Sequence, residues 1–170
     1  FERIDQSALL AKLHTSPRQR RAIAAWLKAG VMDGAELFPT AAGTPQGGVA
    51  SPLLANVALH GLETAITTAF PPTKVVNGRR VNPWRPIVIR YADDTIVGFR
   101  RQADAKRFLR DLRERLAKFG LALHPDKTRL IEFGRHAAEQ RSARGLGKPE
   151  TFDFLGFTHI CGKAKEGGWF

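Results

Sequence analysis

The sequence has 170 residues, of which 27 are Lys or Arg and 16 are Asp or Glu, giving a formal net charge of +11. This length allows one compact domain, and a hydrophobic fraction of 43% supplies a core, which argues against intrinsic disorder. One Cys excludes an internal disulfide and a thiolate metal site. No apolar run approaches the roughly 20 residues that cross a membrane, and no signal-type stretch is present, so we expect a cytoplasmic protein.

The positive charge indicates a polyanionic partner, with nucleic acid as the first candidate. A solvated surface accounts for basic charge equally well, so the motifs must decide between the two interpretations.

Helices dominate the predicted elements of the first half. Asp5 or Ser7 can cap a first helix, and Ser16 with Pro17 begins a second that ends before Gly30. A long third helix is predicted over 51–69 after a Gly-rich segment at 35–50.

Strands and helices alternate in the second half. Period-two alternation predicts a hairpin over 87–99 with acids at its tip, followed by an amphipathic helix over 103–119. Short strands are expected at 121–123 and 129–133, a loop at 134–150 and a strand at 152–160. Together the elements predict an α/β (α+β) fold, in which a mixed, mostly antiparallel sheet packs on helices.

The acidic hairpin carries the sequence Tyr91-Ala92-Asp93-Asp94. Two adjacent ionised carboxylates repel each other, so holding them together is costly. A bound divalent cation removes this repulsion. Hard oxygen ligands suit Mg²⁺, and two such ions about 4 Å apart can activate a hydroxyl and stabilise a leaving phosphate. A plain solvated Asp-Asp turn is the alternative.

The Gly-rich segment Gly43-Thr44-Pro45-Gln46-Gly47-Gly48 precedes the helix that opens Ser51-Pro52-Leu53-Leu54-Ala55-Asn56. Its glycines would let the backbone approach a large flat ligand closely. The Lys-Ser/Thr ending of a phosphate-binding loop is missing, which excludes that interpretation. An ordinary helix entry remains the alternative.

Two further motifs follow in order, His124-Pro125-Asp126-Lys127-Thr128 and Phe154-Leu155-Gly156-Phe157. With the Gly-rich segment and the acidic hairpin, they resemble the palm of reverse transcriptases, and most closely the group II intron-encoded kind. The resemblance covers nearly all of the chain.

The resemblance implies roles for the residues around the acidic hairpin. Asp93 would be a shared ligand of both catalytic Mg²⁺ ions, and Asp94 the auxiliary acid beside it. Tyr91 would pack beneath the primer end, and Lys127 would lie near the leaving pyrophosphate, although a surface lysine explains Lys127 as well.

Other residues would bind the nucleotide, the template and the primer. Gln46 would touch the incoming nucleotide and the template, and Phe1 would form the floor of the sugar pocket or be a core aromatic. Pro45, Gly47 and Gly48 would shape the approach. Leu155 and Gly156 resemble the primer grip, or else belong to an apolar core strand.

One departure concerns the first metal-binding Asp of the family, which by the motif would precede residue 1. Asp5 is a poor substitute, because it caps a helix. We therefore expect residues 1–170 to be a palm domain that is incomplete at both ends, without fingers, thumb or maturase region, and inactive in isolation.

The resemblance implies an RNA-directed DNA polymerase that uses an RNA template, a DNA primer and deoxynucleoside triphosphates, with intron RNA as the expected RNA. Alternatives are a module that binds intron RNA and assists splicing (a maturase), or an inactive relic of a mobile element. Candidate phosphate contacts are the 134–150 loop and Arg18, Arg20, Arg21, Arg79 and Arg80.

Overall fold

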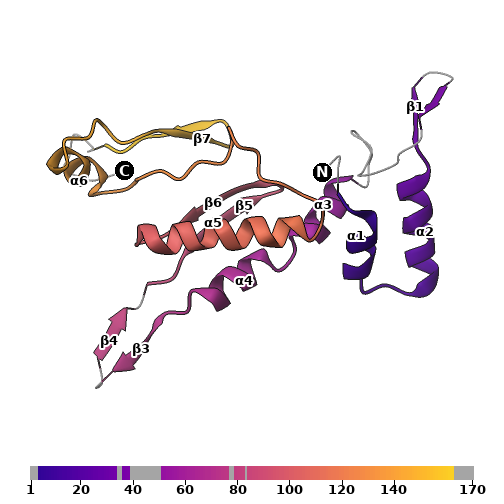
Figure 1. Ribbon diagram of the computed structural model, residues 1–170, viewed down its shortest axis with the longest axis horizontal. Coiled ribbons are helices and arrows are strands. Elements are labelled where there is room, and N and C mark those ends of the chain that lie inside the picture. The colour runs from indigo at the N-terminus through magenta and orange to yellow at the C-terminus, as the bar shows by residue number, and fades with distance from the viewer. Residues whose placement is uncertain (1–3, 34–35, 39–50, 77–78, 83, 163–170) are drawn as a thin grey trace. The chain divides into compact units, whose positions relative to one another are not determined.

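A computed structural model describes residues 4–33, 36–38, 51–76, 79–82 and 84–162 (Figure 1). The chain divides into two compact units, Phe1–His124 and Pro125–Phe170. The helices of the first unit are α1 (Gln6–Lys12), α2 (Pro17–Lys28), α3 (Ser51–Leu59), α4 (Leu62–Ala69) and α5 (Gln102–Ala117). Its strands are β1 (Val31–Asp33), β2 (Glu36–Phe38), β3 (Thr73–Val76), β4 (Arg79–Asn82), β5 (Ile87–Tyr91) and β6 (Asp94–Gly98). The second unit contains α6 (Ala137–Ala143), β7 (Phe152–Phe154) and β8 (Phe157–His159).

The described strands pair two by two in chain order, β1 with β2, β3 with β4, β5 with β6 and β7 with β8, and each pair is antiparallel. The predicted fold class is confirmed, with helices, antiparallel strands and an acidic hairpin. Among the described residues, however, the strands form separate two-stranded sheets where one mixed sheet was expected. Each strand has only three to five residues and pairs with the strand next to it along the chain.

The first two helices begin as predicted. The Asp5 carboxylate accepts hydrogen bonds from the backbone N–H groups of Ser7 (2.8 Å) and Ala8 (3.0 Å). Ser16 and Gln19 form a reciprocal capping box at the start of α2, where Pro17 occupies the first turn. The structure thus confirms Asp5 as a helix cap, a role that uses its carboxylate.

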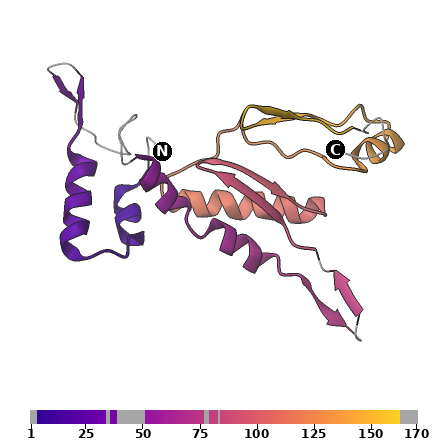
Figure 2. The same cartoon turned by 180° about the vertical axis from the view of Figure 1, so that it is seen from behind.

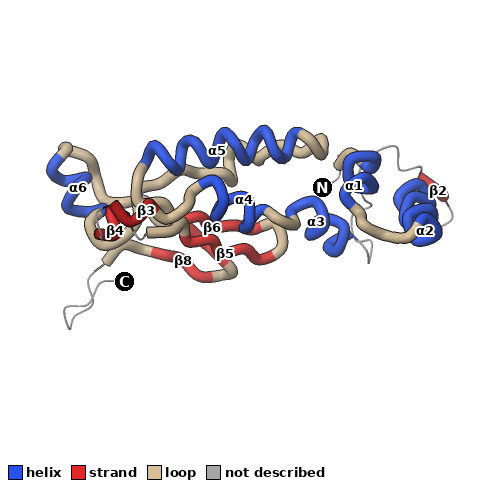
Figure 3. Tube along the Cα trace, turned by 90° about the horizontal axis from the view of Figure 1, so that it is seen from below, coloured by secondary structure: helices blue, strands red, loops and turns tan. Residues whose placement is uncertain are grey.

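The long helix predicted over 51–69 is wrong, because it is interrupted between α3 and α4 (Figure 3). Gly61 adopts a left-handed conformation with φ +80, which an α-helix cannot continue through. Carbonyls near the break are satisfied by side chains: Lys12 Nζ donates to Ala58 O (2.8 Å) and His60 O (2.7 Å), and Arg115 Nη2 donates to His60 O (2.9 Å). Apolar residues keep their helical spacing on both sides of the break, so the sequence pattern does not reveal it.

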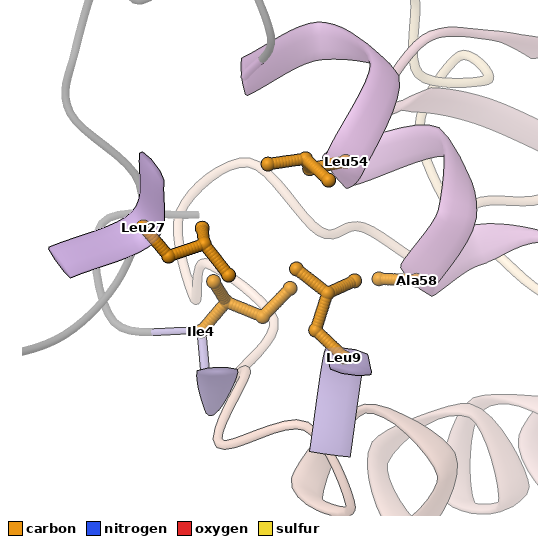
Figure 4. Packing of buried hydrophobic residues seen from close by; sticks show 5 residues of the cluster. All are labelled: Ile4, Leu9, Leu27, Leu54 and Ala58. Atoms are coloured by element: carbon orange, nitrogen blue, oxygen red, sulfur yellow. The ribbon is translucent and has the colours of Figure 1, made fainter. Parts of the chain in front are cut away.

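Two apolar clusters hold the first unit together. In the first cluster, side chains from α1, α2 and α3 meet, and Figure 4 shows Ile4, Leu9, Leu27, Leu54 and Ala58 converging. In the second, Leu62, Ile66 and Phe70 pack with partly buried residues of β5, β6 and α5. Figure 2 shows the helices α4 and α5 running beside the β5–β6 hairpin. Because Val88 and Val97 of the acidic hairpin pack against this cluster, one face of the hairpin rests on it.

Several shorter elements differ from the sequence prediction. The hairpins β1–β2 and β3–β4 were not predicted, and the strands expected at 121–123 and 129–133 are wrong, because the described backbone there forms no ladder. The loop expected over 134–150 contains α6. Glu132 pairs with Arg141 and Arg144, which ties this polar helix to the preceding segment.

The strand expected over 152–160 is a hairpin, β7–β8, that reverses at Leu155 and Gly156. Both residues have positive φ, +52 and +81, as in a type I′ turn. The two residues predicted to be a primer grip thus form a turn that connects two strands.

Candidate active site

The acidic motif forms the tip of the hairpin β5–β6. Five residue pairs align the two strands, from Ile87 with Gly98 to Tyr91 with Asp94. Ala92 and Asp93 make the two-residue turn between them, and Ala92 has a left-handed φ of +52. Asp93 therefore lies in the turn itself, whereas Asp94 begins β6.

Residues of β5 alternate between the two faces of the hairpin. Val88 and the opposite Val97 pack against the buried cluster of α4 and α5. Ile87, Ile89 and Tyr91 point away from it and are 58%, 49% and 65% exposed. Since Asp94 is the cross-strand partner of Tyr91, both side chains lie on this exposed face.

Arg90 belongs to the helix-facing side and is the most connected side chain near the turn. Its Nε donates to Glu63 Oε1 of α4 at 2.6 Å, and its Nη1 donates to Asn56 Oδ1 of α3 at 2.8 Å. The same Nη1 also donates to the backbone carbonyl of Ala92 at 3.0 Å. One guanidinium thus joins two helices to the acidic turn.

The electrostatics of the site depend on this cation. The Arg90 guanidinium, through its hydrogen bond to Glu63, holds the pKa of the Glu63 carboxyl below its usual value of 4.5. Asp93 and Asp94 are both exposed, and neither carboxylate is hydrogen-bonded or ion-paired to another described residue. Both carboxylates are therefore accessible to a ligand.

The structure brings Tyr91, Asp93 and Asp94 together on one hairpin. Lys127, which is exposed, and the turn of Leu155 and Gly156 belong to the second compact unit. The candidates Phe1, Pro45, Gln46, Gly47 and Gly48 lie outside the described residues.

Three residues that sequence reasoning did not assign to the site are connected to the turn: Arg90 donates to the Ala92 carbonyl, and Asn56 and Glu63 accept from Arg90. The available signal was Arg90 itself, a charged residue at an inward position of a strand whose other inward residue is Val88. A charge at such a position needs a partner. The sequence does not show which acid supplies it, because Glu63 is 27 residues away.

Two negative findings apply only to the ranges that the structure describes. No group of three or more His, Cys, Asp or Glu residues there could hold a metal ion by itself. No helix in those ranges combines the length and apolarity needed to cross a bilayer.

A helix-backed hairpin with two exposed carboxylates at its turn is the feature that the sequence motifs predict for a polymerase palm. The chain belongs to the family described as "Reverse transcriptase (RNA-dependent DNA polymerase)", which matches residues 1–159. This confirms the resemblance inferred from the four motifs.

A segment of the chain is also similar to curated proteins. A 66-residue segment is 38% identical to "Group II intron-encoded protein LtrA" of Lactococcus lactis subsp. cremoris, and the same values hold for the protein of strain MG1363. The aligned segment covers 37% of this chain and 11% of each relative. The chain therefore corresponds to a small part of these relatives.

Proposed function

We propose that this chain carries the acidic turn of an RNA-directed DNA polymerase, which joins deoxynucleotides to a primer 3'-hydroxyl. The observation that carries the proposal is the exposure of Asp93 and Asp94 at the tip of a supported hairpin, in a chain of the reverse transcriptase family. Neighbouring carboxylates that have no hydrogen-bond or ion-pair partner among the described residues are suited to hold cations.

The donor set fits Mg²⁺ in kind, because carboxylate oxygens are hard ligands on an accessible turn. Asp93 would hold both ions and Asp94 would assist it, with further ligands from outside the described residues or from nucleotide phosphates. Two bound Mg²⁺ ions supply activation of the primer hydroxyl and stabilisation of the leaving phosphate.

The remaining site residues would position the substrates. Tyr91 would support the primer end, and Lys127 would place positive charge near the leaving pyrophosphate. Leu155 and Gly156 would hold the growing 3' end. The residues assigned to the nucleotide and template are Phe1, Pro45, Gln46, Gly47 and Gly48.

The nucleic-acid partner would be a template–primer duplex that contains RNA, with intron RNA as the template favoured by the similarity to an intron-encoded protein. Arg18, Arg20 and Arg21 are exposed on α2 and can neutralise phosphates. Such contacts bind by charge and shape, with little base specificity.

A second candidate function is RNA binding that assists splicing, which the same intron-encoded relative and the arginines of α2 favour. In this alternative, binding to RNA does not require Asp93. The two functions therefore differ in their dependence on the acidic turn.

The test is Asp93→Asn in the protein expressed in the full form that its gene encodes. Polymerisation predicts that kcat for Mg²⁺-dependent primer extension falls by orders of magnitude while duplex affinity is nearly unchanged, because transition-state stabilisation is lost. The matched control is Glu114→Gln, which removes an exposed carboxylate from α5. We expect this control to leave kcat unchanged. Near-normal turnover of Asp93→Asn would remove Asp93 from the mechanism.

A further inference from the structure

Arg90 is a charged side chain on the face of β5 that packs against the helices. Its side chain is 19% exposed, whereas the neighbouring Ile89 and Tyr91 on the opposite face are 49% and 65% exposed. A guanidinium removed from water is costly unless acceptors compensate it. The three hydrogen bonds to Glu63, Asn56 and Ala92 provide that compensation.

The three acceptors come from three different elements, namely α4, α3 and the turn. The planar guanidinium can donate along several fixed directions at once, which a single ammonium group cannot reproduce. Arg90 therefore fixes the turn relative to the two helices, and does more than neutralise Glu63.

Arg90 contacts the turn at Ala92, a residue with an unfavourable backbone conformation. Ala92 has φ +52, and a left-handed conformation costs a residue with a Cβ about 1–2 kcal/mol. Its carbonyl, which accepts from Arg90, belongs to the same planar peptide group as the N–H of Asp93. Holding this carbonyl thus fixes the peptide plane that leads into Asp93.

We propose that Arg90, anchored by Glu63 and Asn56, is a positioning residue that sets the orientation of Asp93 through the Ala92–Asp93 peptide. This inference rests on the proposed polymerase function, since it concerns the geometry of the proposed metal ligand. Among the described residues, Arg90 contacts the acidic turn at the Ala92 carbonyl, so its effect on Asp93 would pass through the Ala92–Asp93 peptide.

The experiment compares Arg90→Gln, Arg90→Lys and Glu63→Gln with the wild-type full-length protein. We expect kcat for primer extension to fall about 10- to 100-fold in Arg90→Gln, the size of effect that misplacement by about 1 Å produces. The Mg²⁺ concentration for half-maximal activity should rise. Arg90→Lys keeps the charge but not the fork, so it should show an intermediate defect.

A matched control separates positioning from stability. Arg107→Gln removes another arginine of the same unit, which donates to Ala69 O at 2.8 Å and lies over the Phe70 ring at 4.2 Å, with no contact to the turn. It should lower Tm without changing kcat or the Mg²⁺ requirement. If the Arg90 variants lower Tm in the same way and leave both kinetic quantities unchanged, the positioning role is wrong.

A readout that needs no activity keeps this inference distinct from the proposed function. Amide hydrogen exchange across residues 91–94 should be at least about tenfold faster in Arg90→Gln than in Arg107→Gln, because the turn loses its external anchor. Unchanged exchange overturns the positioning role even in an active enzyme.

If wild type extends no primer, or if Asp93→Asn extends it normally, the polymerase proposal fails whatever the exchange result. Should Arg90→Gln not fold, Glu63→Gln serves instead, since the Glu63 side chain is 43% exposed and the substitution is isosteric.

Discussion

Tyr91 lies directly across the β5–β6 ladder from Asp94, as the last residue pair before the turn. Directly opposed side chains have Cβ atoms about 4.5–5.5 Å apart, so a ligand on the Tyr91 ring is also close to the Asp94 carboxylate. This relationship supports the proposal that the primer end and the metal ligands share one face of the hairpin.

The exposed ring of Tyr91 gives a direct test of that face. Tyr91→Ala should weaken binding of the primer end by about 1–3 kcal/mol, the usual range for base–aromatic contacts, and so raise the KM for primer. Tm should change little, because Tyr91 is 65% exposed. Ile87→Ala is the control, since Ile87 lies on the same face at the far end of β5 and is 58% exposed. An equal KM effect in both variants would contradict the placement of the primer end.

Two adjacent leucines of α3 test the first apolar cluster. Leu54 is 8% exposed and packs in the cluster, whereas Leu53 is 67% exposed. Leu54→Ala should lower the free energy of unfolding by about 2–5 kcal/mol, and Leu53→Ala should stay within about 0.5 kcal/mol of wild type. Urea unfolding of both variants measures the difference. Similar losses in the two would mean that α3 does not present Leu54 to this core.

The ion pair of Glu63 and Arg90 makes stability depend on pH in the acid range. Because the folded-state pKa of Glu63 lies below its usual value of 4.5, the unfolded chain takes up the proton first as pH falls. The stabilisation is complete above about 4.5 and is lost as pH drops through the lower, folded-state pKa. Glu63→Gln removes this titration.

The measurement is the difference in unfolding free energy between wild type and Glu63→Gln from pH 7 to pH 3. The difference should shrink toward the acid end. The pKa of Glu132 is also lowered, mainly by the hydrogen bond from Arg144. Because Glu132 titrates in both proteins, its contribution cancels in the comparison. A gap that is constant with pH would show that the Glu63 carboxylate contributes no charge-dependent stability.

Local signals in the sequence predicted the elements that local interactions determine. The caps at Asp5 and Ser16 and the hairpin around Asp93 were predicted, because capping, proline position and period-two alternation act over a few residues. The break at Gly61 was missed, since the apolar spacing of a helix continues on both sides of it.

Interactions between distant residues were not predictable in the same way. The segments 121–123 and 129–133 are rich in apolar residues, yet a strand also needs a partner strand, which local composition does not provide. Arg90 shows the same limit within the site. Its position in β5 followed from the pattern, but its bonds to Asn56 and Glu63 depend on how α3 and α4 lie behind the hairpin.

The turn of β7–β8 separates a stability effect from a functional one. Leu155 adopts φ +52 while 48% exposed, so its side chain gains little from burial and its backbone is strained. Leu155→Asn creates Asn-Gly, the preferred pair for a type I′ turn, and should raise the free energy of unfolding by about 1 kcal/mol. If Leu155 belongs to the primer grip, the same variant should extend primers less efficiently.

The pair of measurements is thermal unfolding and kcat/KM for primer extension. Leu146→Asn is the control, because Leu146 is 45% exposed and its φ is not positive. It should change neither quantity. Greater stability together with unchanged extension would leave Leu155 as a strained turn residue with no part in holding the primer.

The basic face of α2 predicts how binding responds to salt. Arg18, Arg20 and Arg21 are exposed near the start of this helix, in a chain of net charge +11. If they neutralise phosphates of an RNA/DNA duplex, binding releases counterions, and log Kd changes linearly with log salt concentration. Replacing all three with Gln should reduce the magnitude of that slope by about one for each phosphate that is no longer neutralised, with affinity falling equally for unrelated sequences. Arg110→Gln is the control, because Arg110 is already paired with Asp111 at 3.0 Å on α5 and should leave the slope unchanged. Fluorescence anisotropy with a labelled duplex at several salt concentrations gives the slope for wild type and for each variant.

A triple variant with the wild-type slope would place the phosphate-binding residues elsewhere on the chain, because arginines that do not contact phosphates release no counterions from the duplex.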